Sequence, residues 1–201
     1  MNKSEKIQCI RDIVKLKGII RARDLDSTGI PREDLSRLCK NGFLQRVGRG
    51  LYILPDADVT EHHSFAQAAK RIPKGVICLL SALRFHGITT QMPFEVWMAI
   101  EKTARFPRID HPVIRFVRFS GSAFISGIEE HNVEGVVVNI YSAAKTVVDC
   151  FKYRNKIGLD IAIEALRDCR RDALCSINEL WHFAQVCRMT NVMKPYLESI
   201  V

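Results

Sequence analysis

The 201-residue sequence has no apolar run of about 18 residues, the length that a membrane-spanning helix needs. Its first residues, MNKSEKIQCIRD, lack the apolar core of a secretory signal peptide. Seven cysteines are scattered along the sequence without a Cys-x-x-Cys pair. An odd and unpaired set of cysteines argues against a zinc ribbon and against a secreted disulfide framework. We therefore expect a soluble, cytoplasmic protein whose thiols are free and buried or partly buried.

Acidic residues are the scarcer charged type. The sequence has 30 Lys and Arg against 22 Asp and Glu, a net charge of +8. Residues 1–55 hold twelve of the basic and six of the acidic residues, so +6 lies there and +2 lies in residues 56–201. A basic surface attracts the phosphates of duplex DNA. Basic proteins also bind acidic partners or no partner at all, so charge alone leaves these alternatives open.

Three helical segments are expected at the N-terminal end. Apolar residues recur at helical spacing from residue 4 to about residue 16. A short second helix is expected over residues 21–27. Pro31 is expected as the first residue of the third helix, which covers residues 32–40, because its missing N–H would be unpaired there in any case. Asn41-Gly42 ends this helix, since either residue tolerates a left-handed conformation.

A β-hairpin is expected directly after these helices. Two short apolar segments, residues 43–47 and 51–55, flank the turn Gly48-Arg49-Gly50. Three helices and a hairpin in this order predict a winged helix-turn-helix domain over residues 1–55. We expect this domain to bind DNA, with a protein-interaction module as the alternative.

Eight side chains of this domain are expected to contact DNA. Arginine and serine on the polar face of the third helix suit base edges or phosphates in the major groove. An arginine at the tip of the hairpin can enter a narrow minor groove, and the backbone N–H groups that open the second helix favour a phosphate. The predicted contacts are Arg21 and Arg23 of the second helix, Arg32, Ser36, Arg37 and Lys40 of the third, and Arg46 and Arg49 of the hairpin.

Residues 62–201 are expected to form a second domain after a polar linker at residues 56–60. Two helices are predicted first, over residues 63–70 and 76–86. β-Branched and aromatic residues then predict strands over residues 96–100, 114–119 and 136–140. Helical spacing returns and predicts helices over residues 142–152, 159–171, 176–187 and 192–199. The predicted fold class is α+β: an N-terminal winged helix-turn-helix, then a mixed α/β domain with a small sheet and a C-terminal helical segment.

Two patterns in the second domain have the form of catalytic motifs. Ser142 and Lys145 have the Ser-x-x-Lys spacing of penicillin-recognising enzymes, but the other motifs of that set are absent. We expect Ser142 to cap a helix and Lys145 to lie on the helix surface or to face a partner. A PD-(D/E)xK nuclease needs an acid, any residue and a lysine on a strand, whereas the first strand here ends in Glu101-Lys102 with no residue between them. The six histidines lack metal-site spacing, so we expect no catalysis, no metal and no cofactor.

A compact basic cluster separates two of the predicted helices. It consists of Lys152, Arg154 and Lys156. We expect a solvated loop here, with a contact for an acidic partner or for RNA as the alternative.

Four stretches of the sequence resemble the AbiEi family, the antitoxins of AbiE-type abortive-infection systems, which are type IV toxin–antitoxin systems. They are GFLQRVGRGLY at residues 42–52, SALRFHGITT at residues 81–90, AKTVVDCF at residues 144–151 with its continuation to residue 166, and MKPYLE at residues 193–198. These stretches follow one another in the family's order over nearly the whole chain.

The resemblance implies a bacterial protein with two functions. The winged helix would repress its own operon by binding inverted repeats of double-stranded DNA in the promoter. The C-terminal domain would neutralise a nucleotidyltransferase-like toxin without a stable complex. The matching stretches place antitoxin function at Lys145 and Asp149 and, with them, at the cluster of Lys152, Arg154 and Lys156. We expect a monomer or a weak dimer that has no contact with membranes.

Two other functions stay open from the sequence. One is a transcription factor whose C-terminal domain senses a small ligand, and the other is a metal-dependent enzyme that acts on nucleic acid. A nucleotidyltransferase-like reading frame next to this gene would favour the antitoxin over both.

Overall fold

The computed structural model describes residues 3–89 and 91–199. The chain divides into two compact units. The first comprises Met1–Pro73 together with the short segment Asn132–Val138, and the second comprises Lys74–His131 and Asn139–Val201. The first unit thus extends past residue 55, the predicted end of the N-terminal domain.

The first unit contains helices and a small sheet. Its elements are α1 (Lys3–Lys17), β1 (Ile20–Arg21), the 3-10 helix η1 (Ala22–Thr28), α2 (Arg32–Lys40), β2 (Gln45–Gly48), β3 (Leu51–Ile53) and α3 (His63–Arg71). The helices at residues 4–16 and 32–40 are confirmed. The second helix is a 3-10 helix, and Pro31 lies just outside α2 with extended backbone (φ −61°, ψ 141°), one residue before its predicted place.

The three strands of this unit form one antiparallel sheet in the order β1-β3-β2. The predicted hairpin is therefore confirmed, and β1 adds a strand that was not predicted. Ile20 of β1 pairs with Tyr52, and Arg46 of β2 pairs with the same residue from the other side. A strand of two residues leaves almost no alternation to detect in the sequence.

The core of the first unit joins the helices to the sheet. Its buried side chains are Ile10, Val14, Ile20, Leu25, Ile30, Leu35, Leu38, Leu44, Tyr52 and Leu54. Burying an aliphatic side chain of this size contributes about 1.5–3 kcal/mol before the entropy of ordering is subtracted. This core fixes which face of α2 remains in solvent.

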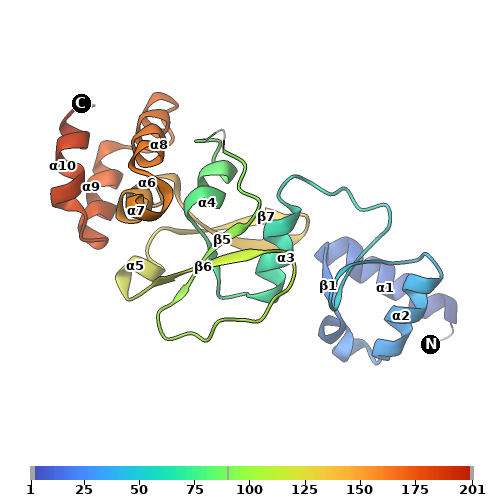
Figure 1. The fold of residues 1–201 in the computed structure, drawn as a ribbon. Helices are drawn as coiled ribbons and strands as arrows, with labels where there is room; N and C mark the ends of the chain where they lie inside the picture. Colours follow the sequence, from blue (N-terminus) through green and yellow to red (C-terminus); the bar gives the residue numbers. More distant parts are fainter. Residues whose placement is uncertain (1–2, 90, 200–201) are drawn as a thin grey trace. The chain divides into compact units, whose positions relative to one another are not determined.

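The second unit is built around a mixed sheet (Figure 1). Its first elements are β4 (Val76–Ile77), α4 (Leu79–Phe85), β5 (Val96–Glu101), β6 (Ile114–Phe119), α5 (Ser122–Ile125), β7 (Ile128–Val133) and β8 (Val136–Tyr141). The strand order is β6-β5-β4-β8-β7. β5 runs parallel to β6 and antiparallel to β4, and β4 runs parallel to β8. The tip of the β7–β8 hairpin, Asn132–Val138, is counted with the first unit.

Five helices follow the sheet. They are α6 (Ala143–Lys152), α7 (Arg154–Ile157), α8 (Leu159–Arg171), α9 (Ile177–Val186) and α10 (Thr190–Glu198), and α6 packs against the other four and against α4. The four long helices confirm the prediction for this part of the chain. Ser176 and Glu179 form the capping box expected at the start of α9, each satisfying a backbone N–H. The mixture of helices and sheet confirms the α+β class.

Two secondary-structure predictions for the second unit are wrong, and one of its strands was not predicted. The segment expected as one helix over residues 76–86 begins with strand β4, because Val76 and Ile77 pair with Ala99 and Met98 inside the sheet. An apolar segment that is buried on both sides gives no alternation, so its period does not separate strand from helix. The expected loop at the basic cluster contains α7, and strand β7 was missed because its sequence, IEEHNV, is polar.

The state of the cysteines and the length of the helices agree with what the sequence predicts. All seven cysteines are free, five of them buried and two partly buried, which confirms the prediction for the thiols. In the described part of the chain, every helix is too short or too polar to cross a membrane.

Candidate functional site

The outward face of α2 carries most of the predicted DNA contacts. Leu35 and Leu38 are buried in the core of the first unit, which turns Ser36, Arg37 and Lys40 toward solvent. These three side chains lie within about one helical turn of one another on the same side. The structure therefore brings together the residues that the helical spacing selected.

Two arginines of α2 form ion pairs that leave them exposed. Arg32 Nη2 lies 3.1 Å from Asp26 Oδ2, and Arg37 Nη1 lies 3.4 Å from Asp34 Oδ1. Both arginine side chains keep 66% of their surface in solvent. Exposed pairs of this kind contribute about 0–1 kcal/mol, so a phosphate competes readily for either guanidinium.

The hairpin between β2 and β3 presents the other two predicted arginines. Arg46 and Arg49 are exposed, and Arg46 Nε donates a hydrogen bond to the Gly48 carbonyl at 3.1 Å. Gly50 has a φ of +72°, the left-handed region that favours glycine, and nothing lies within 4 Å of the position a Cβ would take. The turn thus leaves open space around the tip that carries Arg49.

The start of the second helix differs from the expectation. Arg23 is exposed, but Arg21 is half-buried, and burial lowers the pKa of its guanidinium, with the charge of Arg23 acting in the same direction. Asp24 Oδ2 accepts a hydrogen bond from the Arg21 backbone N–H at 2.8 Å, and Lys70 Nζ lies 3.2 Å from the same oxygen. An internal carboxylate therefore occupies the place where a phosphate was expected.

Burial and hydrogen bonding oppose each other at Asp24. Burial alone would raise the pKa of this carboxyl, but the Arg21 N–H and the Lys70 ammonium outweigh it and lower the pKa. Asp24 therefore stays ionised and links η1 to α3. Nothing in the sequence pattern identified Lys70 as its partner, because the two residues lie 46 positions apart.

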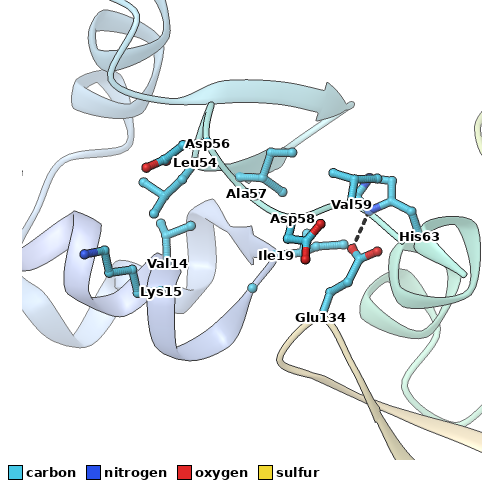
Figure 2. Close-up of a pocket in the computed structure, with 12 residues that line it drawn as sticks. Val14, Lys15, Ile19, Leu54, Asp56, Ala57, Asp58, Val59, His63 and Glu134 are labelled. Atoms are coloured by element: carbon cyan, nitrogen blue, oxygen red, sulfur yellow. Dashed lines mark hydrogen bonds and ion pairs between the residues drawn. The ribbon is translucent and has the colours of Figure 1, made fainter. Parts of the chain in front are cut away.

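A second polar cluster of the first unit was not predicted. Glu134, at the tip of the β7–β8 hairpin, accepts hydrogen bonds from the backbone N–H and hydroxyl of Thr60 at 2.7 and 2.8 Å. Its other oxygen lies 2.5 Å from Nδ1 of His63. Figure 2 shows this contact at one side of a hollow of about 290 Å³ that the linker residues Asp56–Val59 also line. Glu134 thus fixes the predicted linker to the hairpin tip.

Lys145 and Asp149 form a buried ion pair in the second unit. Lys145 Nζ lies 2.5 Å from Asp149 Oδ2, and both side chains are 0% exposed. The prediction that Lys145 lies on the helix surface or faces a partner is therefore wrong. The side chain points into the core, where its ammonium lies 4.2 Å from the ring centroid of Tyr141 and 4.8 Å from that of Phe119.

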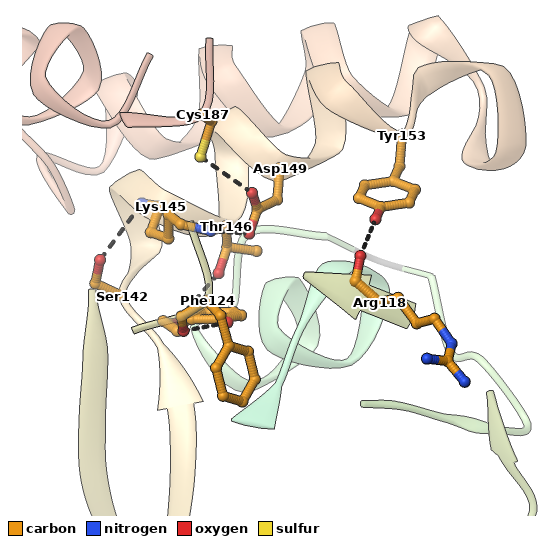
Figure 3. Close-up of polar contacts among 9 residues, drawn as sticks. Arg118, Phe124, Ser142, Lys145, Thr146, Asp149, Tyr153 and Cys187 are labelled. Atoms are coloured by element: carbon orange, nitrogen blue, oxygen red, sulfur yellow. Dashed lines mark hydrogen bonds and ion pairs between the residues drawn. The ribbon is translucent and has the colours of Figure 1, made fainter. Parts of the chain in front are cut away.

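The surroundings of Asp149 are shown in Figure 3. The Cys187 thiol donates to Asp149 Oδ1 over 3.5 Å. Burial raises the pKa of Asp149, because it outweighs the opposing effect of Lys145. In this conformation neither Lys145 nor Asp149 is open to a macromolecular partner. Their assignment to antitoxin function stays a prediction. Because both side chains are buried, they would affect such a function only through the packing of α6.

Ser142 caps α6. Its hydroxyl accepts a hydrogen bond from the Lys145 backbone N–H at 3.4 Å, as Figure 3 shows. The ammonium of Lys145 is held by Asp149 instead. This geometry confirms the cap that was predicted for Ser142, and the geometry of a serine nucleophile with a lysine base is not formed.

The basic cluster after α6 lies at the surface. Lys152 and Lys156 are exposed, and Arg154 is half-buried because its Nη1 donates to the Phe151 carbonyl at 2.9 Å. Lys156 Nζ lies 5.5 Å from the ring centroid of Tyr153. Of the five residues that the resemblance assigns to antitoxin function, these three are the ones that can meet a partner directly.

A metal site would need several ligands at one place. Among residues 3–89 and 91–199, the His, Cys, Asp and Glu side chains form no group of three or more that could hold a metal ion. Glu101 and Lys102, which were weighed as a nuclease motif, are exposed at the end of β5.

Comparison with known proteins selects the same N-terminal segment. Residues 10–55 match a family model described as a transcriptional regulator, AbiEi antitoxin. The resemblance to AbiEi antitoxins is thus confirmed for this segment. The match runs from the middle of α1 to the end of the β2–β3 hairpin, and it includes all eight predicted DNA contacts. It does not extend into the second unit.

A solved structure shares the fold. The crystal structure of the RV2827C protein from Mycobacterium tuberculosis is similar with a TM-score of 0.63, at 13% sequence identity over 90% of this chain and 70% of that one. At this identity the likeness shows the fold alone. No curated protein matches the sequence.

Proposed function

We propose that this protein is a DNA-binding transcriptional repressor and an antitoxin of a type IV toxin–antitoxin system. In this proposal, residues 1–55 are a winged helix-turn-helix domain that binds inverted repeats of double-stranded DNA in its own promoter. The domain at residues 62–201 neutralises a nucleotidyltransferase-like toxin without catalysis and without a stable complex. The protein acts in the cytoplasm as a monomer or a weak dimer.

The exposed cationic surface of the first unit carries the proposal. The core holds α2 with Ser36, Arg37 and Lys40 in solvent, and the adjoining hairpin exposes Arg46 and Arg49. A helix that projects such side chains fits the major groove, and an arginine at a hairpin tip fits a narrow minor groove. The family match to residues 10–55 supports the regulatory part, since it covers all of these residues.

The DNA-binding part is tested with the DNA upstream of this gene. Arg37→Ala and Arg49→Ala are each expected to lose about 1–3 kcal/mol of binding free energy in a gel-shift titration. The control is Arg167→Ala, which removes an exposed arginine from α8 in the second unit and should leave affinity unchanged. Unchanged affinity for both test variants would refute the assignment of α2 and the hairpin.

The antitoxin part is tested separately. Co-expression with the product of a neighbouring nucleotidyltransferase-like gene should restore growth, and it should still do so with the double variant Arg37→Ala/Arg49→Ala. The surface variant Lys152→Ala/Lys156→Ala is expected to weaken protection while the purified protein remains folded. If residues 1–55 alone protect the cells, the proposed division of labour is wrong.

A further inference from the structure

A second basic surface lies on the second unit, at the edge of the sheet. Strand β6 is an edge strand, and the loop between β5 and β6 lies beside it. Residues 102–118 and 152–156 carry eight Lys and Arg against one acid, Asp110. The rest of residues 56–201 carries ten Lys and Arg against fifteen Asp and Glu. The small net charge of this part of the chain therefore hides a strong local concentration of cations.

Contacts within the unit link the two basic segments across the edge of β6. The hydroxyl of Tyr153 donates to the Arg118 carbonyl at 3.0 Å, as seen in Figure 3. The Arg118 guanidinium donates to the Lys102 carbonyl and lies 4.3 Å from the ring centroid of Phe106. With Lys156 against the ring of Tyr153, cations and aromatic rings alternate from the β5–β6 loop to α7. We name the surface of Lys102, Phe106, Arg118, Lys152 and Lys156 the β6 surface.

One aromatic ring on this surface is unusually open to solvent. Phe106 is 54% exposed, although one side of it contacts Phe116 with ring centroids 5.6 Å apart. Phe94 is 87% exposed. It precedes Glu95, which pairs with Arg115 at 2.6 Å near the start of β6. Arg115 and Arg118 are an odd number of residues apart on β6, so their side chains leave opposite faces of the sheet, and Phe94 is not counted with the β6 surface.

Exposed rings beside cations have the chemistry of a single-stranded nucleic-acid site. Phosphates pair with Lys and Arg, and unstacked bases stack on aromatic rings. A duplex would use the cations alone, because its bases are already stacked with one another. We infer that the β6 surface binds single-stranded nucleic acid over a few nucleotides.

This inference does not depend on the function proposed for the first unit, because its residues all lie in the second unit. The inference assigns one class of ligand, single-stranded nucleic acid, to the basic cluster at residues 152–156. It also separates two kinds of nucleic acid within one chain: duplex DNA at α2 and the hairpin, and an unpaired strand at the β6 surface.

The test uses the full-length protein and fluorescein-labelled 12-nucleotide oligo-uridine, with oligo-thymidine of equal length as the DNA arm and a hairpin RNA as the duplex control. Fluorescence anisotropy should show salt-sensitive binding of at least one single strand and weaker binding of the hairpin. Phe106→Ala should weaken binding of the single strand about ten-fold, since one stacked base is lost. Lys152→Ala/Lys156→Ala should also weaken it and reduce the salt dependence.

Matched variants separate this site from the first unit and from misfolding. Phe106→Leu keeps an apolar cover on Phe116 but removes the flat ring, so it should weaken binding like Phe106→Ala. Arg167→Ala and Arg37→Ala/Arg49→Ala should bind the single strand as the unsubstituted protein does. Absence of binding to both single strands, equal binding of the hairpin, or no effect of Phe106→Ala and Phe106→Leu would overturn the inference.

Discussion

Lys145 and Asp149 show how a pattern of single residues can have two opposite meanings. Their spacing of four residues suits a pair on one helix face, whether that face is in solvent or in the core. The sequence predicted the surface because lysine is rarely buried without a partner. The pair is buried because Cys187, Tyr141 and Phe119 surround it. None of these three residues belongs to α6, which carries both members of the pair.

Removing one member of this pair should destabilise the second unit. Lys145→Met leaves Asp149 charged or unpaired in the core and is expected to cost about 3–5 kcal/mol of unfolding free energy. The double variant Lys145→Met/Asp149→Leu should recover most of that loss. Urea unfolding of the purified proteins measures both. Equal stability of Lys145→Met and the unsubstituted protein would show that the pair is not buried as described.

Asp24 gives a prediction for pH. Its pKa is lowered in the folded protein, so its stabilising effect is present above the pKa of the unfolded chain, about 4, and is lost as the pH falls through the lower folded value. Asp24→Asn should therefore cost about 1–3 kcal/mol at neutral pH and progressively less below pH 4. Unfolding free energies of both proteins at several pH values test this. A difference that does not shrink in acid would contradict the assignment of the charge to Asp24.

At the scale of elements, two turns that contain a glycine with positive φ differ in how closely other segments pack against them. Gly50 and Gly135 both have a left-handed backbone, with φ of +72° and +78°. A Cβ on Gly50 would meet nothing within 4 Å, whereas one on Gly135 would lie 2.8 Å from the Gly18 backbone nitrogen. The hairpin of the first unit is thus open at Gly50, while the β7–β8 tip is packed directly on the end of α1.

This contrast predicts different costs for the same substitution. Gly50→Ala should destabilise the protein by about 1 kcal/mol, the cost of the backbone conformation. Gly135→Ala carries that cost and a backbone clash as well, so its loss of stability should be clearly larger. Thermal unfolding of the two variants side by side provides the comparison. A smaller loss for Gly135→Ala would mean that the hairpin tip is not held against α1.

The elements themselves were predictable to different degrees. Long amphipathic helices such as α8 and the hairpin around Gly48-Arg49-Gly50 follow from local periodicity and turn chemistry. β4 and β7 do not, because one is a two-residue buried strand and the other a polar one. Their place depends on pairing partners that lie far away in the sequence, and such pairing leaves no local signal.

At the scale of the whole molecule, the distribution of charge along the chain tells more about binding surfaces than the net charge does. The first unit exposes the predicted DNA contacts of α2 and the hairpin, and this exposure follows from which leucines the core buries. The β6 surface was only partly predictable: its cluster at residues 152–156 is contiguous in sequence, but the β5–β6 loop and strand β6 join it only through the fold. Sequence therefore predicts the first surface residue by residue and the second only in fragments.

The central claim, that α2 and the hairpin bind duplex DNA, is tested most directly by the salt dependence of binding to the promoter DNA. Each cation that neutralises a phosphate contributes about one unit to the slope of log affinity against log salt concentration. If Arg37 and Arg49 both neutralise phosphates, Arg37→Ala/Arg49→Ala should reduce that slope by about two units and weaken binding. Arg167→Ala should leave both unchanged. An unchanged slope together with unchanged affinity in the double variant would contradict the account.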